Sequence, residues 1–279
     1  MAHPAVITLT TDFGLSDPFV GVMKGVILRC ATNTTIVDLT HAVPPQNLAA
    51  ASWLLSHAAG WFPRGTVHLA VVDPGVGSAR RALAVRCREF TLVGPDNGIF
   101  TETLLRFPAL EAVSIEPVAV AAPTVMSATF HGRDLFALAA AEIALGRPVS
   151  ELGPALAVYE LVHLVLPQPI ASAEAITGTV RWIDRFGSLI SDIVPAMLGA
   201  GADGASASAA APPYGGWLVT GGDCTVRGIL RTYADAADAE LVALFGSSGT
   251  LELAVRNGSA AERTGIGLGA RIQLRRDLV

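Results

Sequence analysis

The sequence predicts an α/β amino-terminal domain with a largely parallel sheet, followed by a smaller all-β, barrel-like carboxyl-terminal domain. Up to residue 146, short apolar strands alternate with alanine-rich helical segments, which is typical of α/β proteins. Beyond a proline-rich stretch at residues 166–169, short strands follow one another in close succession. We therefore expect an α/β domain over residues 1–166, a linker over 167–175 and a β domain over 176–279.

The composition excludes several classes of protein. A chain of 279 residues with 51% hydrophobic and 15% charged residues can build one large or two ordinary cores and is not disordered. Its net charge of −5 and the lack of basic runs argue against binding to duplex nucleic acid. No apolar run has membrane-spanning length and no secretory signal opens the chain, so we expect a cytoplasmic protein.

Cysteine usage points to a reducing compartment. Cys30, Cys87 and Cys224 are widely spaced, and no two of them have metal-ligand spacing. Because an odd count gives no disulfide framework, free thiols are the simplest interpretation.

The first predicted strand, residues 6–10, leads to an acid. Asp12 follows it and precedes a glycine turn. Asp17 and Pro18 then introduce a helix predicted over residues 19–31, with Asp17 as its N-cap. Asp12 can be an ordinary turn acid, but ligands in open α/β sheets bind beyond the carboxyl ends of the strands. The next strand, loop and helix are expected at residues 35–39, 41–47 and 48–60.

A second acid, Asp73, ends the apolar run at residues 67–72, which reads as a buried strand with His68 packed inside it. Glycines at 75 and 77 let the following loop fold tightly. Arg80 lies seven positions beyond Asp73, so the two side chains can pair. A surface turn with a salt bridge is the alternative, but two acids at strand ends on one sheet edge favour a site.

His131 opens the last helical segment of the first domain, which we expect over residues 135–146. A lone histidine is more often structural than catalytic, but Gly132 beside it leaves room for a ligand at a helix entry. Before it, a strand pair and a glycine-punctuated turn are expected at residues 81–87, 90–93 and 94–100.

The second domain is predicted from short strands alone. The stretch 199–216 is low in complexity and reads as a mobile loop without chemistry. The strands are expected at residues 177–184, 189–193, 217–219, 224–226, 241–244, 251–255 and 270–274.

Six stretches together carry a family resemblance. They read Thr11-Asp12-Phe13-Gly14; Asp73-Pro74-Gly75-Val76-Gly77 with Arg80; Pro95-Asp96-Asn97-Gly98; Phe130-His131-Gly132-Arg133-Asp134; Ile183-Asp184-Arg185-Phe186-Gly187; and Gly246-Ser247-Ser248-Gly249 with Arg256-Asn257-Gly258. In this order they resemble the S-adenosylmethionine (SAM) hydroxide adenosyltransferases, relatives of fluorinase and chlorinase. The resemblance covers essentially the whole chain.

The resemblance implies an enzyme that hydrolyses SAM to adenosine and L-methionine by attack of water at C5′. It places the family's Asp–Arg–His set on Asp73, Arg80 and His131. SAM is then the substrate, and no cofactor or metal is expected. The halogenases resemble this chain less here, because they carry tyrosine at the position of Asp73 and lack the histidine at His131. A carboxylate would repel a halide, whereas water needs acceptors that orient it.

The roles of these side chains can be divided. Arg80 is expected to pair with Asp73 and orient it, which makes Asp73 a weak base. We therefore expect Asp73 and His131 to position the water, with His131 as the proton acceptor near neutral pH.

The family resemblance also implies which residues bind the substrate. Asp12 matches the acid that bonds the ribose hydroxyls, and Asp184 the acid near the methionine amine. Tyr233 matches an aromatic residue that packs on adenine, and Ser247 a contact to the methionine carboxylate. The other expected binding residues are Phe130, Gly132, Phe186, Ser188, Ser248, Glu252, Arg256 and Gly258.

Two positions depart from the family, and a third differs from the halogenases. Ser188 and Asp192 stand where asparagines are usual, and Gln46 stands where the halogenases stack a tryptophan. A single hydroxyl at Ser188 offers adenine fewer hydrogen bonds than an amide. Two rival functions stay open beside a hydrolase. One is a halogenase of the same superfamily, and the other, which Ser188 keeps open, is a SAM- or adenosine-binding protein without turnover.

A third rival is a metal-dependent hydrolase that uses Asp12, Asp73 and His131, although their spacing matches no metal signature. The resemblance also implies a homotrimer in which the site lies between the amino-terminal domain of one subunit and the carboxyl-terminal domain of the next.

Overall fold

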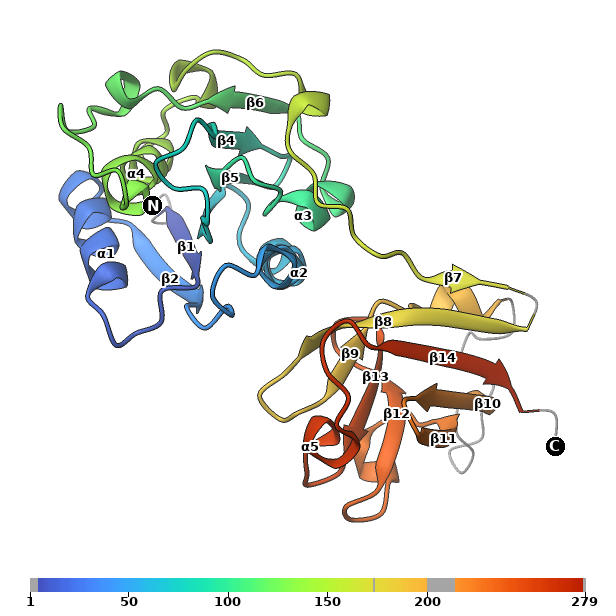
Figure 1. The fold of residues 1–279 in the computed structure, drawn as a ribbon. Helices are drawn as coiled ribbons and strands as arrows, with labels where there is room; N and C mark the ends of the chain where they lie inside the picture. Colours follow the sequence, from blue (N-terminus) through green and yellow to red (C-terminus); the bar gives the residue numbers. More distant parts are fainter. Residues whose placement is uncertain (1–4, 173, 200–213, 278–279) are drawn as a thin grey trace. The chain divides into compact units, whose positions relative to one another are not determined.

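The computed structural model describes residues 5–172, 174–199 and 214–277. The chain divides into two compact units, Met1–Val165 and Leu166–Val279 (Figure 1). Residues 200–213 of the predicted loop at 199–216 lie outside the described residues.

The first unit is built on a mixed, mostly parallel sheet of six strands, in the order β2-β1-β3-β5-β4-β6. Strands β1, β2, β3 and β5 run parallel, and β4 is antiparallel to both β5 and β6. The prediction of an α/β domain with a largely parallel sheet is therefore confirmed. The strands are β1 (Val6–Thr11), β2 (Thr35–Thr40), β3 (Thr66–Val71), β4 (Ala82–Arg86), β5 (Phe90–Pro95) and β6 (Glu111–Ser114).

Helices cover both faces of this sheet. Helix α1 packs against α4, and α2 packs against α3; the two pairs lie on opposite sides of the strands in Figure 1. The α-helices are α1 (Phe19–Cys30), α2 (Leu48–Ala58), α3 (Thr101–Arg106) and α4 (Ala137–Ala144). Short helical turns are η1 (Ala59–Trp61), η2 (Pro117–Val120), η3 (Gly132–Phe136), η4 (Val149–Glu151) and η5 (Val158–Glu160).

Two helix starts differ from the prediction. Asp17 does not cap α1, because Pro18 already has helical torsions (φ −75°, ψ −3°) and occupies the cap position without a side-chain hydrogen bond. The Pro18 carbonyl accepts the first helical bond from Val22 N–H (2.9 Å). The helix predicted from residue 135 starts earlier, as the π-helical turn η3, and continues as α4. Single π turns are common at functional sites.

Strand β5 extends two residues beyond its predicted end. Pro95 pairs with Ala82 across the β4–β5 ladder, so the expected turn begins only at Asp96. A Cβ at Gly94 would overlap the Ala70 carbonyl oxygen, so glycine is required where β5 lies closest to β3.

The second unit is an antiparallel, nearly closed, barrel-like sheet in the order β11-β10-β14-β8-β9-β13-β12, as predicted. A bridge between Leu230 and Leu244 links its two ends. The strands are β7 (Ile170–Ala171), β8 (Ala175–Ile183), β9 (Leu189–Ser191), β10 (Tyr214–Gly221), β11 (Cys224–Ile229), β12 (Leu241–Phe245), β13 (Leu251–Val255) and β14 (Arg271–Arg276). Its helical turns are η6 (Pro195–Leu198), η7 (Tyr233–Asp235) and α5 (Ala260–Thr264).

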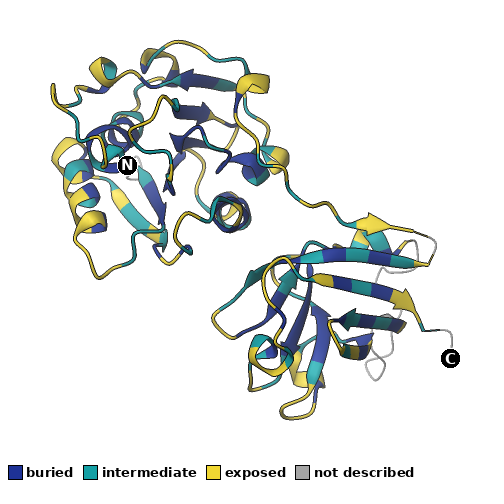
Figure 2. Cartoon of the chain, in the orientation of Figure 1, coloured by how far each residue is buried: buried dark blue, intermediate teal, exposed yellow. Residues whose placement is uncertain are grey.

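Each unit has its own core. In the first, the central strands are buried and the outward faces of the helices are exposed (Figure 2). Strand β3 is buried along its whole length, so His68 is fully buried and packs between the rings of Phe62 and Phe90, as expected.

Strand β7 lies inside the predicted linker yet pairs with β8. No helix of the described residues is long and apolar enough to cross a membrane.

Candidate active site

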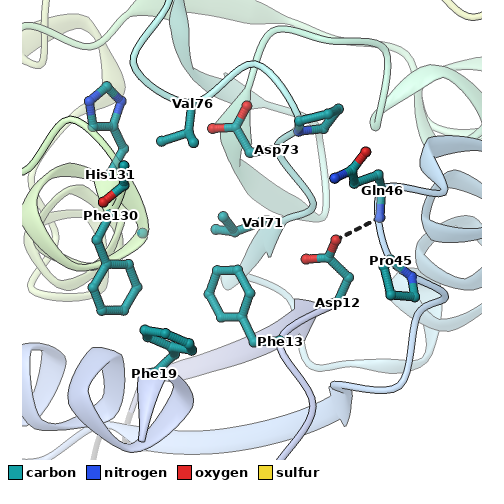
Figure 3. A pocket seen from close by; sticks show the side chains of 13 residues that line it. Asp12, Phe13, Phe19, Pro45, Gln46, Val71, Asp73, Val76, Phe130 and His131 are labelled. Carbon is teal, nitrogen blue, oxygen red and sulfur yellow. Dashed lines mark hydrogen bonds between the residues drawn. The ribbon is translucent and has the colours of Figure 1, made fainter. Parts of the chain in front are cut away.

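A cavity of about 420 Å³ opens at the carboxyl ends of β1 and β3 in the first unit (Figure 3). These strands are parallel neighbours whose last paired residues are Thr11 and Val71, so Asp12 and Asp73 emerge at the same sheet edge. His131 and Phe130, at the start of η3, form the wall opposite Gln46. The cavity is lined by Asp12, Phe13, Phe19, Pro45, Gln46, Val71, Asp73, Pro74, Val76, Thr129, Phe130, His131 and Gly132.

Asp73, Arg80 and His131 are directly connected. Arg80 Nε donates to both carboxylate oxygens of Asp73 (3.0 Å each), and Arg80 Nη2 donates to Oδ2 (2.5 Å). The same Nη2 lies 2.9 Å from His131 Nδ1. The side chains of Arg80 and Asp73 are only 10% and 5% exposed, so this is a partly desolvated, fork-shaped ion pair. The loop does curl back as the seven-residue spacing predicted.

The contact with Arg80 fixes the tautomer of His131. A guanidinium has only donors, so His131 Nδ1 must accept, and the proton of the neutral ring is on Nε2. Burial, reinforced by the positive charge of Arg80, lowers the pKa of His131 below its ordinary value of 6.5. His131 is therefore neutral near pH 7 and offers an N–H group at Nε2, whereas its basic nitrogen is already engaged.

Asp12 is held by the loop that follows β2. Its Oδ2 accepts a hydrogen bond from the backbone N–H of Gln46 (2.8 Å). Gln46 has a left-handed backbone (φ 63°), which is unfavourable for a residue other than glycine. Strain of this kind persists where the surroundings compensate for it, often at ligand sites. Here the bond to Asp12 compensates, and it leaves Asp12 Oδ1 for a ligand.

A polar chain supports the strand end that carries Asp12. The hydroxyl of Thr11 lies 2.8 Å from Nδ1 of the buried His41, and His41 Nε2 faces Asp38 Oδ1 at 3.0 Å. Burial would raise the pKa of Asp38, but hydrogen bonds with Lys24 and His41 outweigh it and lower that pKa. The loop histidine at 41 was not predicted as part of the site, because its partners lie on other strands.

The apolar wall of the cavity is aromatic. The rings of Phe13, Phe19 and Phe130 pack edge to face, with centroids 5.3–6.0 Å apart. Phe13 and Phe19 were not predicted as site residues, although both follow Asp12 within seven residues, which was a usable signal. Gly132 lines the cavity too, and a Cβ there would lie close to Met23 (3.2 Å) and Phe130 (3.3 Å), so a larger residue would need these neighbours to shift slightly.

In the second unit, Asp184, Ser188, Tyr233 and Glu252 form one cluster. Asp184 Oδ1 accepts from the backbone N–H groups of Phe186 (2.9 Å) and Ser188 (2.8 Å). The Tyr233 hydroxyl donates to Oε1 of the buried Glu252. The pKa of Glu252 is raised by burial and, to a smaller extent, by the negative charge of Asp184. The pKa of Tyr233 is raised by burial and by its hydrogen bond to Glu252. Phe186 is 80% exposed beside this cluster.

Two turns adjoin the cluster. A Cβ at Gly246 would overlap the Glu252 carboxylate, so the turn at 246–249 that carries Ser247 and Ser248 lies directly over Glu252. Arg256 donates to the Ala236 carbonyl at the end of the Tyr233 turn. Its guanidinium therefore supports that turn.

The family models decide which family this is. The model of the SAM hydroxide adenosyltransferase N-terminal domain matches residues 7–153, and that of the C-terminal domain matches residues 178–273.

The chain belongs to the SAM hydroxide adenosyltransferase family.

Its relatives agree with this assignment. A protein of Thermus thermophilus named (R)-S-adenosyl-L-methionine hydrolase is 42% identical over 270 residues, covering 95% of this chain and 97% of that protein. A protein of the same name from Salinispora tropica is 35% identical over 274 residues, covering 98% and 99%. A fluorinase of Actinoplanes is 27% identical over 213 residues, covering 67% and 71%.

Solved structures share the whole fold. An uncharacterized conserved protein from Thermotoga maritima matches with a TM-score of 0.87 at 32% identity, covering 97% of this chain and 100% of that one. A conserved hypothetical protein from Thermus thermophilus matches with a TM-score of 0.75 at 39% identity, covering 97% and 99%.

The structure gives Asp192, one of the positions at which this chain departs from the adenosyltransferase family, a structural role. Asp192 accepts from the backbone N–H (2.7 Å) and hydroxyl (3.2 Å) of Thr179, and burial raises its pKa. Asp192 thus joins β9 to β8 within the sheet. Across the described ranges, no three His, Cys, Asp or Glu side chains are grouped to hold a metal ion.

Proposed function

We propose that this protein hydrolyses SAM to adenosine and L-methionine by attack of water at C5′. The observation that carries the proposal is the bonded Asp73–Arg80–His131 set: Asp73 and His131 line the same cavity as Asp12, and Arg80 joins them from behind the cavity wall. Relatives that align over nearly the whole chain are named SAM hydrolases, which supports it.

The chemistry asks mainly for orientation. The oxygen of water forms a bond to C5′ while the C5′–S bond breaks. The electron pair of the C5′–S bond stays on sulfur, and methionine leaves as a neutral thioether. This leaving group needs no general acid, so the site's task is to hold water in line with the breaking bond. Carboxylate charge at Asp73 attracts the sulfonium and disfavours a halide, which argues against the halogenase alternative.

We assign the water-positioning roles from the hydrogen-bond pattern. Asp73 accepts a hydrogen bond from water and takes its proton as the new C–O bond forms. His131 donates from Nε2–H to the water oxygen, because Nδ1 is engaged by Arg80. This assignment moves the proton acceptor from His131, which the sequence favoured, to Asp73.

Substrate binding is proposed to draw on both units. Asp12 bonds the ribose hydroxyls, and the Phe13–Phe19–Phe130 wall receives apolar parts of the substrate. In the second unit, Asp184 and the 246–249 turn are assigned to methionine, and Tyr233 with Ser188 to adenine. We propose a homotrimer in which two subunits complete each site, and a cytoplasmic location consistent with the free thiols of Cys30, Cys87 and Cys224.

We further propose that the R epimer at sulfur is the preferred substrate. Relatives carry that epimer in their names. A sulfonium centre is pyramidal, so its two epimers point the methyl group and the methionine chain in exchanged directions around the same C5′–S bond. A site that fixes ribose and water independently can align only one of them for attack.

The deciding experiment incubates the purified protein with each SAM epimer in ¹⁸O-enriched water, with and without chloride, and identifies products by mass spectrometry. We expect ¹⁸O-labelled adenosine and methionine, formed faster from the R epimer and independently of chloride. Chlorinated nucleoside would indicate a halogenase, and bound but intact SAM would indicate a binding protein. Equal rates for both epimers would contradict only the stereochemical proposal.

A further inference from the structure

The turn that follows β5 contacts both ends of the loop that carries Asp73 and Arg80. We propose that Asp96 and Asn97 are positioning residues that set the geometry of this 73–80 loop. The inference rests on the proposed function for its catalytic consequence, but the anchoring itself depends only on contacts within the first unit.

Asn97 holds the start of the loop. The ladder between β3 and β5 ends at the pair Leu69–Val93, so the Val72 carbonyl lies beyond the last strand partner on that side. Asn97 Nδ2 donates to this carbonyl (2.9 Å), while Asn97 Oδ1 accepts from the Ile99 N–H (3.2 Å). Val72 is fully buried, and a buried carbonyl without a partner is costly. The Asn97 amide therefore replaces a missing strand bond immediately before Asp73.

Asp96 holds the end of the loop. Its Oδ2 accepts from Arg81 Nε (2.7 Å) and Nη2 (2.6 Å), and its backbone N–H donates to the Arg81 carbonyl (3.0 Å). The Asp96 side chain is only 2% exposed and that of Arg81 is 32% exposed, so the carboxylate of this ion pair is desolvated while the guanidinium keeps part of its contact with solvent. Arg81 is thereby fixed immediately after Arg80.

Because Asp96 and Asn97 are consecutive, their anchor points cannot move apart. Adjacent Cα atoms lie about 3.8 Å from each other. The residues before and after the loop, Val72 and Arg81, are thus held at a set separation, and Asp73 meets Arg80 across the closed loop. Small errors in the placement of reacting groups reduce rates steeply, so the anchors should matter for catalysis although neither lines the cavity.

The same turn also receives the segment that ends the first unit. Asp96 Oδ1 accepts from Val162 N–H (2.8 Å), and Thr101 Oγ1 accepts from Leu164 N–H (2.9 Å). A Cβ at Gly98 would overlap Leu164. The Thr101 hydroxyl also donates to the Gly98 carbonyl at the end of the turn (2.6 Å). Thr101→Val thus perturbs the same turn but leaves both contacts to the residues that flank the 73–80 loop, which makes it a control for Asn97.

The test compares Asn97→Ala, Asp96→Asn and Thr101→Val in the full-length chain. Hydrogen–deuterium exchange of peptides covering the 73–80 loop reports anchoring without substrate, and steady-state adenosine formation reports kcat and KM. We expect faster loop exchange and a kcat lowered about tenfold in the Asn97 and Asp96 variants, with KM nearly unchanged. We expect wild-type loop exchange and kcat in Thr101→Val.

Every outcome of this comparison supports or contradicts the anchoring role of Asp96 and Asn97. Wild-type loop exchange in Asn97→Ala, or an equal loss of kcat in Asn97→Ala and Thr101→Val, would overturn the proposal. If Asn97→Ala does not fold, Asp96→Asn gives the same two readouts. A wild-type protein that forms no adenosine would contradict the proposed function instead, and the exchange data would still test the anchors.

Discussion

Replacing Arg80 by lysine tests the connection at the centre of the site. The substitution keeps the positive charge next to Asp73 but removes the planar fork of donors. In the structure that fork makes three contacts with the Asp73 carboxylate and one with His131 Nδ1. A lysine ammonium can keep one bond to Asp73, but it cannot span both partners in one plane.

The expected magnitude follows from the bonds lost. The two contacts of Nε share a single N–H and count as one bond, so Arg80 makes two bonds to Asp73, of which lysine keeps one. The loss is therefore two charge-assisted hydrogen bonds, one to Asp73 and one to His131, each worth about 1.5 kcal/mol. The total of about 3 kcal/mol corresponds to a kcat roughly 100-fold lower, if the lost orientation is felt in the transition state. KM should change much less, because Arg80 is not among the residues that line the cavity.

The assay is adenosine formation at saturating SAM, with thermal unfolding as a check of the fold. The matched control is Arg147→Lys, which alters an arginine that contacts Glu142 and Glu151 away from the cavity, and whose kcat should equal that of the wild type. An Arg80→Lys enzyme within threefold of the wild-type kcat would refute the reasoning.

Three further predictions concern single residues. Because burial and Arg80 lower the pKa of His131, kcat should fall as pH drops through a value below 6.5. His131→Asn should lose that acid limb, and an unchanged pH–rate profile would contradict the assignment. Gln46→Gly should keep the bond from the backbone N–H to Asp12 and relieve the left-handed strain, so the free energy of unfolding should stay within about 1 kcal/mol of the wild-type value. KM should rise about threefold to tenfold, because the side chain that lines the cavity is removed. An unchanged KM would remove Gln46 from the binding site. Burial lowers the pKa of His68 from 6.5 to about 4, so the unfolded chain binds a proton at a higher pH than the folded chain does. The free energy of unfolding should therefore decrease by about 3 kcal/mol as the pH falls from 6.5 to about 4. Urea unfolding of His68→Phe should show a flatter decline, and a decline as steep as in the wild type would exclude His68 as its source.

Much of the fold could be predicted because its signals are local. The alternation of apolar runs with helical segments predicted the α/β unit, and closely spaced short strands predicted the barrel-like unit. Errors fell at element ends, as at Asp17 and at the start of η3, where one hydrogen bond decides the boundary. Such bonds depend on backbone torsions that a residue pattern does not specify.

Parts of the site could be predicted for the same reason. Asp12 and Asp73 each follow an apolar strand, and Arg80 returns to Asp73 within one short loop, so spacing alone brought them together. The Thr11–His41 contact, the amide of Asn97 on Val72 and the Glu252–Tyr233 pair were not predicted. Each joins residues whose separation in space is set by the register of other strands.

The sequence by itself determined the family, the fold class and the presence of Asp73, Arg80 and His131 at turns and helix starts, because these follow from residue order and local patterns. Only the tertiary structure decided which nitrogen of His131 carries the proton, and it is on this ground that we propose Asp73 as the proton acceptor. The physical reason is that protonation and hydrogen-bond direction depend on which donor approaches each atom. That approach is fixed by packing between segments that are distant in the chain.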